Sequence, residues 1–128
     1  MNLRALIVDD NPHFLDAVRA LLEREGIAVP ALASTTAEAV DLVERHRPDL
    51  ALVDVDLGAE SGFDVAERLA GSAGHRPRIV LISTYAAQDV AELVDGSPAI
   101  GFLSKSDISA AALRALLAQA TPDDGDLR

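Results

Sequence analysis

Short runs of apolar residues alternate with segments of helical spacing along this chain of 128 residues. The clearest runs cover residues 5–8, 50–53, 79–82 and 100–103. Continuous apolar runs of this length are typical of strands that are buried on both faces of a parallel sheet. The segments between them carry apolar residues three and four positions apart, which predicts amphipathic helices. We therefore expect strands and helices to alternate along the chain.

Local signals place the ends of the first two helices. Asn11 followed by Pro12 predicts an N-cap and a first-turn proline, and Gly26 predicts the end of the helix that begins there. Thr35 and Glu38 have the spacing of a capping box, which predicts the start of a second helix.

A further strand is expected over residues 27–33, and it contains Pro30. Proline has no backbone N–H to donate, so this strand belongs at an edge of the sheet. In the flavodoxin-like strand order 2-1-3-4-5 the second strand is an edge strand, in agreement with the proline. The pattern predicts an α/β fold: a flavodoxin-like (βα)5 three-layer sandwich around a parallel five-stranded sheet.

The second half of the chain completes this pattern. We expect a loop over residues 56–62, a short fourth helix near 88–94, and a last helix capped by Ser109. One domain is predicted over residues 1–120, followed by an acidic, disordered tail at 121–128.

Polar side chains follow the strands at the points where they end. The residues at four successive strand ends are Asp9 with Asp10, Asp54 with Asp56, Ser83, and Ser104 with Lys105. Ligands of open α/β sheets bind outside the carboxyl ends of the strands, so these side chains should meet at one edge. Several neighbouring carboxylates repel one another unless a cation lies among them. The sequence therefore predicts a divalent-metal and phosphoryl site.

This ordered set of residues resembles the receiver domain of bacterial two-component response regulators, over about residues 3–120. The segment Gly-Phe-Leu-Ser-Lys-Ser at 101–106, with the alanine- and leucine-rich last helix, is similar to actinobacterial receivers found in and beside LuxR-type regulators. The resemblance implies that Asp54 accepts a phosphoryl group from a sensor histidine kinase in phosphorelay signalling. It also implies Mg²⁺ or Mn²⁺ as the cofactor.

The resemblance assigns a role to each site residue. It implies that the metal is held by Asp9, Asp10, Asp54 and the backbone carbonyl of Asp56.

The remaining roles concern the phosphoryl group and the response to it. The resemblance implies that Ser83, Thr84 and Lys105 bind the phosphoryl oxygens, although Thr84 replaces a residue that is often alanine in the family. Ser83 and Phe102 would form the switch, which changes a surface made by the fourth helix, the fifth strand and the fifth helix. A downstream protein or a second copy of the chain would bind there.

Composition limits the other classes of function. The formal net charge is −10, which disfavours direct nucleic-acid binding because phosphate contacts carry most of that affinity. There is no cysteine, so the chain has no disulfide framework. No apolar stretch reaches the roughly 18 residues needed to span a membrane. We expect a cytoplasmic protein that does not bind membranes.

Other interpretations of the same residues remain open. Asp54 and Asp56 form an Asp-x-Asp motif, which in haloacid-dehalogenase-type phosphatases supplies the nucleophile and the acid/base. A receiver-like binding module that works without phosphorylation is a second alternative. A receiver cut from a longer DNA-binding regulator is a third, although we expect a stand-alone receiver. We expect no enzyme activity beyond self-phosphorylation from a donor and autodephosphorylation.

Overall fold

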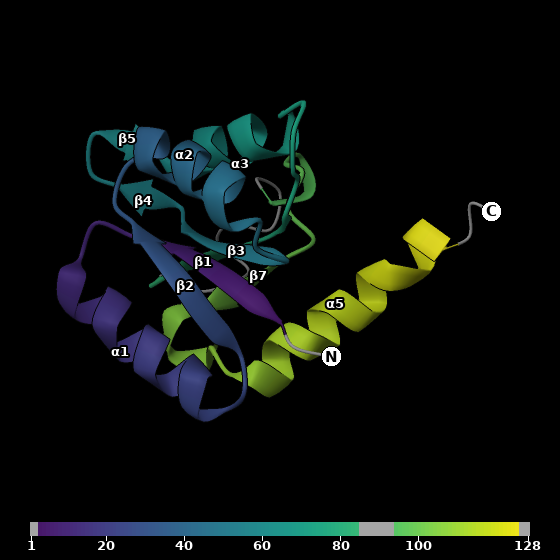
Figure 1. The fold of residues 1–128 in the computed structure, drawn as a ribbon, viewed down its shortest axis with the longest axis horizontal. Coiled ribbons are helices and arrows are strands. Elements are labelled where there is room, and N and C mark those ends of the chain that lie inside the picture. Colours follow the sequence, from purple (N-terminus) through teal and green to yellow (C-terminus); the bar gives the residue numbers. More distant parts are fainter. Residues whose placement is uncertain (1–2, 85–93, 126–128) are drawn as a thin grey trace.

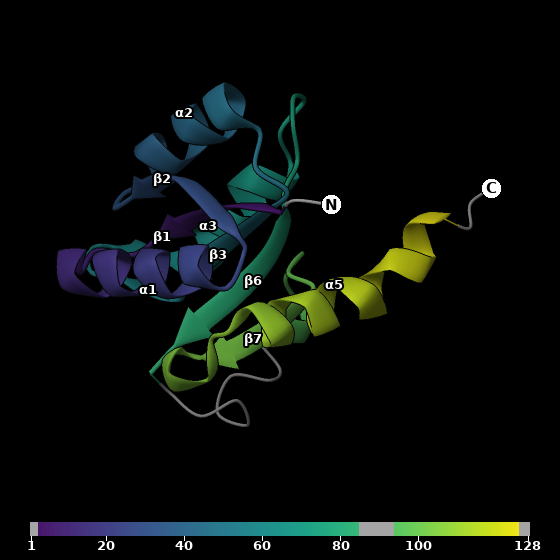
Figure 2. The same cartoon turned by 60° about the horizontal axis from the view of Figure 1, so that its bottom comes forward.

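Five parallel strands form the central sheet of the protein. A computed structural model describes residues 3–84 and 94–125, with side chains as far as residue 119. The strands lie in the order β2-β1-β3-β6-β7, which is the predicted flavodoxin-like order (Figures 1 and 2). Their bounds are β1 Arg4–Val8, β2 Ala28–Ala33, β3 Leu50–Asp54, β6 Arg78–Ser83 and β7 Gly101–Ser104.

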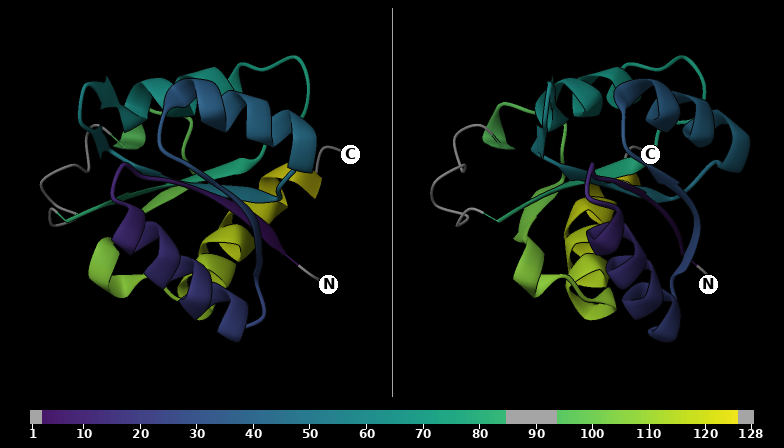
Figure 3. Two further views of the ribbon diagram at one scale, coloured as in Figure 1. Left: turned by 60° about the vertical axis from the view of Figure 1, so that its left-hand side comes forward. Right: turned by 90° about the vertical axis from the view of Figure 1, so that its left-hand side faces the viewer.

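Helices cover both faces of this sheet. Figure 3 shows α2 and α3 on one side of the strands and α1 and α5 on the other, so the three-layer sandwich is confirmed. The helices are α1 Pro12–Arg24, α2 Thr36–His46, α3 Gly62–Ala70 and α5 Ala110–Gly125, with the 3₁₀ turn η1 at Lys105–Asp107. The helix expected near 88–94 lies almost wholly outside the described residues.

The hydrophobic core is divided by the sheet into two clusters. Along β1, Ala5 and Ile7 belong to the cluster beneath α1 and α5, whereas Leu6 and Val8 belong to the cluster beneath α2 and α3. All four are almost completely buried. Successive side chains of a strand point to opposite faces, so burial on both faces requires the continuous apolar run seen in the sequence.

The predicted helix caps are present, with one difference. The Asn11 side chain accepts hydrogen bonds from the backbone N–H groups of His13 and Phe14, and the Thr35 hydroxyl accepts one from Glu38. The Glu38 carboxylate accepts from the backbone N–H of Ser34, 2.8 Å away. A capping box pairs this carboxylate with the N–H of the N-cap residue, Thr35, whereas here it also bonds to the residue before it.

Two segments differ from the sequence prediction. The expected loop at 56–62 contains a two-stranded antiparallel hairpin, β4 (Asp56–Leu57) with β5 (Glu60–Ser61). Helical backbone in α5 continues to Gly125, past the boundary expected at residue 120, and Figures 1 and 2 show this end projecting away from the sheet. Alanine and leucine, which favour helix, dominate residues 110–120, whereas the continuation over residues 121–125 contains neither. Within residues 3–84 and 94–125, no helix has the length and apolar character to cross a bilayer.

Candidate functional site: an acidic cluster at the carboxyl edge of the sheet

Two buried carboxylates lie at the carboxyl ends of neighbouring strands. Asp9 directly follows β1 and is completely buried, and Asp54 is the last residue of β3 and is 5% exposed. The backbone continues the sheet at both places, because Asp9 N–H donates to the Ala33 carbonyl and Val55 N–H donates to the Ile82 carbonyl. Rigid sheet backbone therefore holds both side chains.

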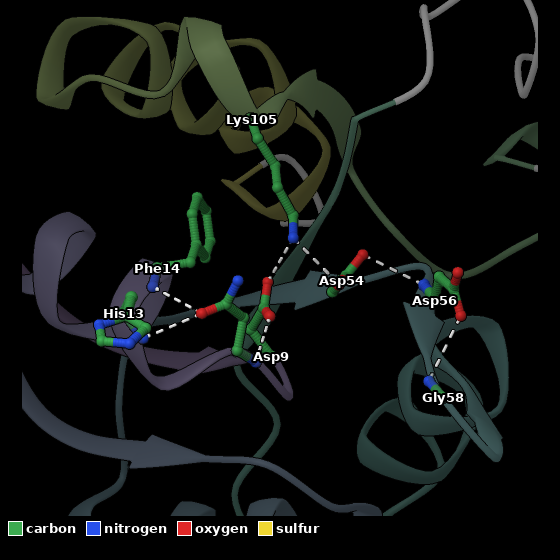
Figure 4. A network of polar contacts seen from close by, with 8 residues as sticks. Asp9, His13, Phe14, Asp54, Asp56, Gly58 and Lys105 are labelled. Carbon is green, nitrogen blue, oxygen red and sulfur yellow. Dashed lines mark hydrogen bonds and ion pairs between the residues drawn. The ribbon is translucent and has the colours of Figure 1, made fainter.

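Lys105 joins the two carboxylates. Its Nζ lies 2.7 Å from Asp9 Oδ2 and 3.1 Å from Asp54 Oδ2 (Figure 4). The second oxygen of each carboxylate accepts a backbone N–H: Asp9 Oδ1 accepts from Asn11 at 2.9 Å, and Asp54 Oδ1 accepts from Asp56 at 3.1 Å. Within the described part of the chain, the ion pair with Lys105 is the only polar contact of the buried Asp9 Oδ2.

The charges in this cluster perturb one another. Burial raises the pKa of the Asp54 carboxyl to about 6, and the nearby charge of Asp9 adds to this effect. The Asp56 N–H and the Lys105 ammonium act in the opposite direction and only partly compensate. Burial also disfavours the Lys105 ammonium, but its bonds to Asp9 and Asp54 outweigh this and raise the pKa of Lys105. The lysine therefore stays charged at neutral pH.

A third carboxylate completes a group that suits a divalent cation. One oxygen from each of Asp9, Asp10 and Asp54 lies within 4.8 Å of the others, and Asp10 is exposed to solvent. The single charge of Lys105 cannot neutralise three carboxylates. Magnesium binds carboxylate oxygens and keeps several waters, which the exposed side of the cluster would admit. The residues present therefore fit the cofactor expected from the sequence.

The predicted site residues share one cavity, with one exception. A cavity of about 290 Å³ is lined by Asp9, Asp10, Asn11, Asp54, Asp56, Gly58, Ser83, Thr84 and Lys105. Phe102 is not part of this lining. It is half-buried on β7 and packs against the cluster beneath α2 and α3.

The Asp56 side chain forms a hydrogen bond within its own hairpin. Its Oδ1 accepts a hydrogen bond from Gly58 N–H at 3.3 Å, and the side chain is exposed. Gly58 has φ +70°, and a Cβ atom there would lie 3.2 Å from Asp10 Oδ2. The hairpin therefore reaches over the acidic cluster. The metal contact expected from the Asp56 carbonyl stays a prediction.

Gly62 is a site residue that the sequence reasoning missed. It begins α3, and a Cβ atom at this position would lie 1.9 Å from the backbone oxygen of Asp54 and 2.7 Å from Val55 Cα. Its N–H donates to the Val55 carbonyl at 3.0 Å. Only glycine lets the helix start this close to the phosphoacceptor candidate. Glycine at the first turn of a helix is a poor helix former, and that signal was available in the sequence.

Comparison with known proteins identifies this arrangement. The family model for the response regulator receiver domain matches residues 5–118, which is most of the chain. The chain belongs to the response regulator receiver family. Such receivers act in two-component phosphorelay signalling.

Several relatives are similar over most of this receiver. The response regulator MprA of Mycolicibacterium vanbaalenii is 35% identical over 130 residues, covering 98% of this chain and 54% of MprA. The transcriptional regulatory protein PdtaR of Mycobacterium tuberculosis is 29% identical over 102 residues, covering 80% of this chain and 49% of PdtaR. The receiver thus spans about half the length of the curated relatives it matches.

Solved structures share its fold. A LuxR-family two-component response regulator from Aurantimonas superimposes with a TM-score of 0.80 at 27% identity, over 94% of this chain and 86% of that one. A response regulator from Burkholderia pseudomallei, crystallised with a phosphorylated aspartic acid, a calcium ion and citrate, gives 0.77 at 27% identity, over 98% and 74%.

Proposed function

We propose that this receiver accepts a phosphoryl group on Asp54 from a sensor histidine kinase. The observation that carries the proposal is the position of Lys105, which binds Asp9 and Asp54 together at the carboxyl edge of the sheet. The phosphorylated aspartic acid in the Burkholderia pseudomallei relative supports the same chemistry here. With a pKa of about 6, Asp54 is mostly ionised at neutral pH and available as a nucleophile.

The residues of the chain have separate tasks in this reaction. An oxygen of Asp54 forms the new bond to phosphorus while the bond from phosphorus to the donor nitrogen breaks, and the imidazole leaves with that electron pair. Lys105 supplies a fixed positive charge beside the group being transferred. Asp9, Asp10, Asp54 and the Asp56 carbonyl would hold Mg²⁺ or Mn²⁺, which neutralises phosphoryl charge when bound.

The phosphoryl group would be sensed by hydroxyl groups at the end of β6. Ser83 is buried and Thr84 is exposed, and both line the cavity beside Asp54. We assign them to the phosphoryl oxygens. Ser83 and Phe102 would then transmit the change to the surface around β7 and α5. Part of that surface, residues 85–93, lies outside the described residues.

This surface would determine what the receiver binds after phosphorylation. We propose that the charged form binds a downstream protein or a second copy of the chain, that the domain itself does not bind nucleic acid or membranes, and that it works in the cytoplasm. Its own chemistry would be limited to phosphorylation from a donor and autodephosphorylation.

The proposal is tested by incubating the protein with phosphoramidate and Mg²⁺ and weighing it intact. We expect one added phosphoryl group, lost when EDTA replaces Mg²⁺. The matched variants are Asp54→Asn and Asp56→Asn, which remove one carboxylate each, two residues apart. The first should take up no phosphoryl group and the second should still do so. Undiminished uptake by Asp54→Asn would refute the assignment.

A further inference from the structure

An aromatic ring on α1 faces the lysine of the acidic cluster. Lys105 Nζ lies 4.3 Å from the centroid of the Phe14 ring, and Figure 4 shows the ring beside the ammonium group. A cation within about 6 Å of an aromatic ring face is attracted by the negative charge density of that face. Phe14 therefore contacts the residue that joins Asp9 to Asp54.

The start of α1 determines where this ring lies. The Asn11 side chain caps the helix and accepts the backbone N–H of Phe14 at 3.2 Å. Phe14 is half-buried and packs against the core cluster beneath α1 and α5. The same short segment thus fixes Asp9, through the Asn11 N–H, and the ring. Leucine would pack equally well at this position. What the aromatic ring adds is therefore its contact with Lys105.

We propose that Phe14 is a positioning residue for Lys105. This inference rests on the proposed function, because it concerns the lysine that would bind the phosphoryl group. Lysine has a long, flexible stem, and its ammonium has three N–H groups that can turn in several directions. The Asp9 and Asp54 carboxylates attract the ammonium from one side. The Phe14 ring contacts the ammonium at a separate place, and the ring has no oxygen or nitrogen that would compete with the two carboxylates.

The ring contact, like the ion pair with Asp9, does not depend on the Asp54 carboxylate. Phosphorylation of Asp54 would change one of the two carboxylate partners of Lys105. The contact between Phe14 and Lys105 involves neither carboxylate, so it can persist while that partner changes. We infer that the ring keeps the ammonium directed at the Asp9–Asp54 edge before and after transfer.

A structural test uses the fact that Lys105 is the only lysine in the chain. Protein labelled with ¹³C-lysine, without a lysine in any added tag, gives a single Cε–Hε signal. We expect this signal to be shifted upfield by the ring current in the wild type and in Phe14→Tyr, and to move toward the random-coil position in Phe14→Leu. A wild-type signal at the random-coil position would overturn the inference, even if Phe14→Leu does not fold.

A kinetic test uses the initial rate of phosphorylation by phosphoramidate at a fixed Mg²⁺ concentration. Loss of the ring in Phe14→Leu should slow the reaction by about two- to fivefold, the range expected for a partly exposed cation–π contact. Phe14→Tyr should restore the rate. The Mg²⁺ dissociation constant should not rise, because the ring supplies no metal ligand and a less well positioned ammonium competes with the metal less for Asp9 and Asp54.

The matched control is Phe63→Leu. Phe63 is also half-buried, but it packs against the cluster beneath α2 and α3 on the opposite face of the sheet. Equal slowing by both leucine variants, or no slowing by Phe14→Leu, would show that the ring serves packing only and would overturn the inference. If the wild type takes up no phosphoryl group on Asp54, the proposed function fails, whereas the position of the lysine signal still reports on Phe14.

Discussion

Replacing Asp54 with asparagine should stabilise the metal-free protein at neutral pH. Asp54 is 5% exposed and lies beside Asp9, and its pKa is raised from 3.8 to about 6. Its ionised form is therefore less favourable in the folded protein than in the unfolded chain. Asp54→Asn removes this charge, and Lys105 keeps its ion pair with Asp9 at 2.7 Å.

The size of the stability gain and its dependence on pH follow from the pKa values of Asp54 in the unfolded and folded states. One pKa unit corresponds to about 1.4 kcal/mol, so the difference between 3.8 and about 6 is about 3 kcal/mol. Below pH 4 the carboxyl is protonated in the folded protein and the penalty is absent. Between about pH 4 and 6 the folded state binds more protons than the unfolded state, so the unfolding free energy of the wild type falls as the pH rises. Above pH 6 to 7 the full difference should remain.

The assay is urea unfolding in EDTA at pH 4.5, 6.0 and 7.5 for the wild type, Asp54→Asn and Asp56→Asn. The Asp56 variant is the control for removing one charge from an acidic protein, because that carboxyl is exposed and asparagine can still accept from Gly58. We expect a gain only in Asp54→Asn, growing with pH toward about 3 kcal/mol, or roughly 10 °C in melting temperature. Mg²⁺ should reduce the difference in unfolding free energy between Asp54→Asn and the wild type, because it stabilises the wild type by binding. An equal gain in both variants, or a gain that does not grow with pH, would refute the reasoning.

Three further substitutions test the surroundings of the site. Gly62→Ala should lower the unfolding free energy by on the order of 3 kcal/mol and abolish phosphorylation, because its Cβ would lie 1.9 Å from the Asp54 carbonyl oxygen. Gly71→Ala, whose Cβ would have its nearest atom at 3.2 Å, should lower the unfolding free energy much less in the same urea experiment. Glu60→Ala removes the hydrogen bonds that join β5 to the start of α2, at 2.8 and 2.9 Å from Thr36. It should lower the unfolding free energy by about 1 kcal/mol and weaken Mg²⁺ binding, whereas Glu60→Gln should retain both the stability and the Mg²⁺ affinity. Lys105→Met should bind Mg²⁺ roughly tenfold more tightly by titration calorimetry, because the ammonium no longer competes for Asp9 and Asp54; unchanged affinity would contradict the geometry of the cluster.

The sheet could be predicted from the sequence because its signals are local and repeated. The three central strands, β1, β3 and β6, contain continuous apolar runs, and their burial on both faces requires such runs. Pro30 lies on β2, which is the edge strand of the sheet, as its missing N–H predicted. The strand ends then placed Asp9, Asp54 and Lys105 at one edge without any knowledge of their distances.

Other features depend on contacts that no local pattern announces. The β4–β5 hairpin has two residues in each strand, too few for an alternating pattern to be recognised. Phe14 has the spacing of a core residue on α1, and its contact with Lys105 exists only because the η1 turn and α1 lie close together in space. Gly62 is required by the backbone of Asp54, eight positions earlier in the chain, and that clash is visible only in three dimensions.

The central claim is that Asp54 carries the phosphoryl group, and the most direct test is chemical trapping of its position. Borohydride reduces an aspartyl phosphate to homoserine but leaves free carboxylates unchanged. After phosphorylation with Mg²⁺ and phosphoramidate, reduction and proteolysis, mass spectrometry should find homoserine at position 54 and aspartate at positions 9, 10 and 56. Homoserine at another of these positions, with position 54 intact, would contradict the account.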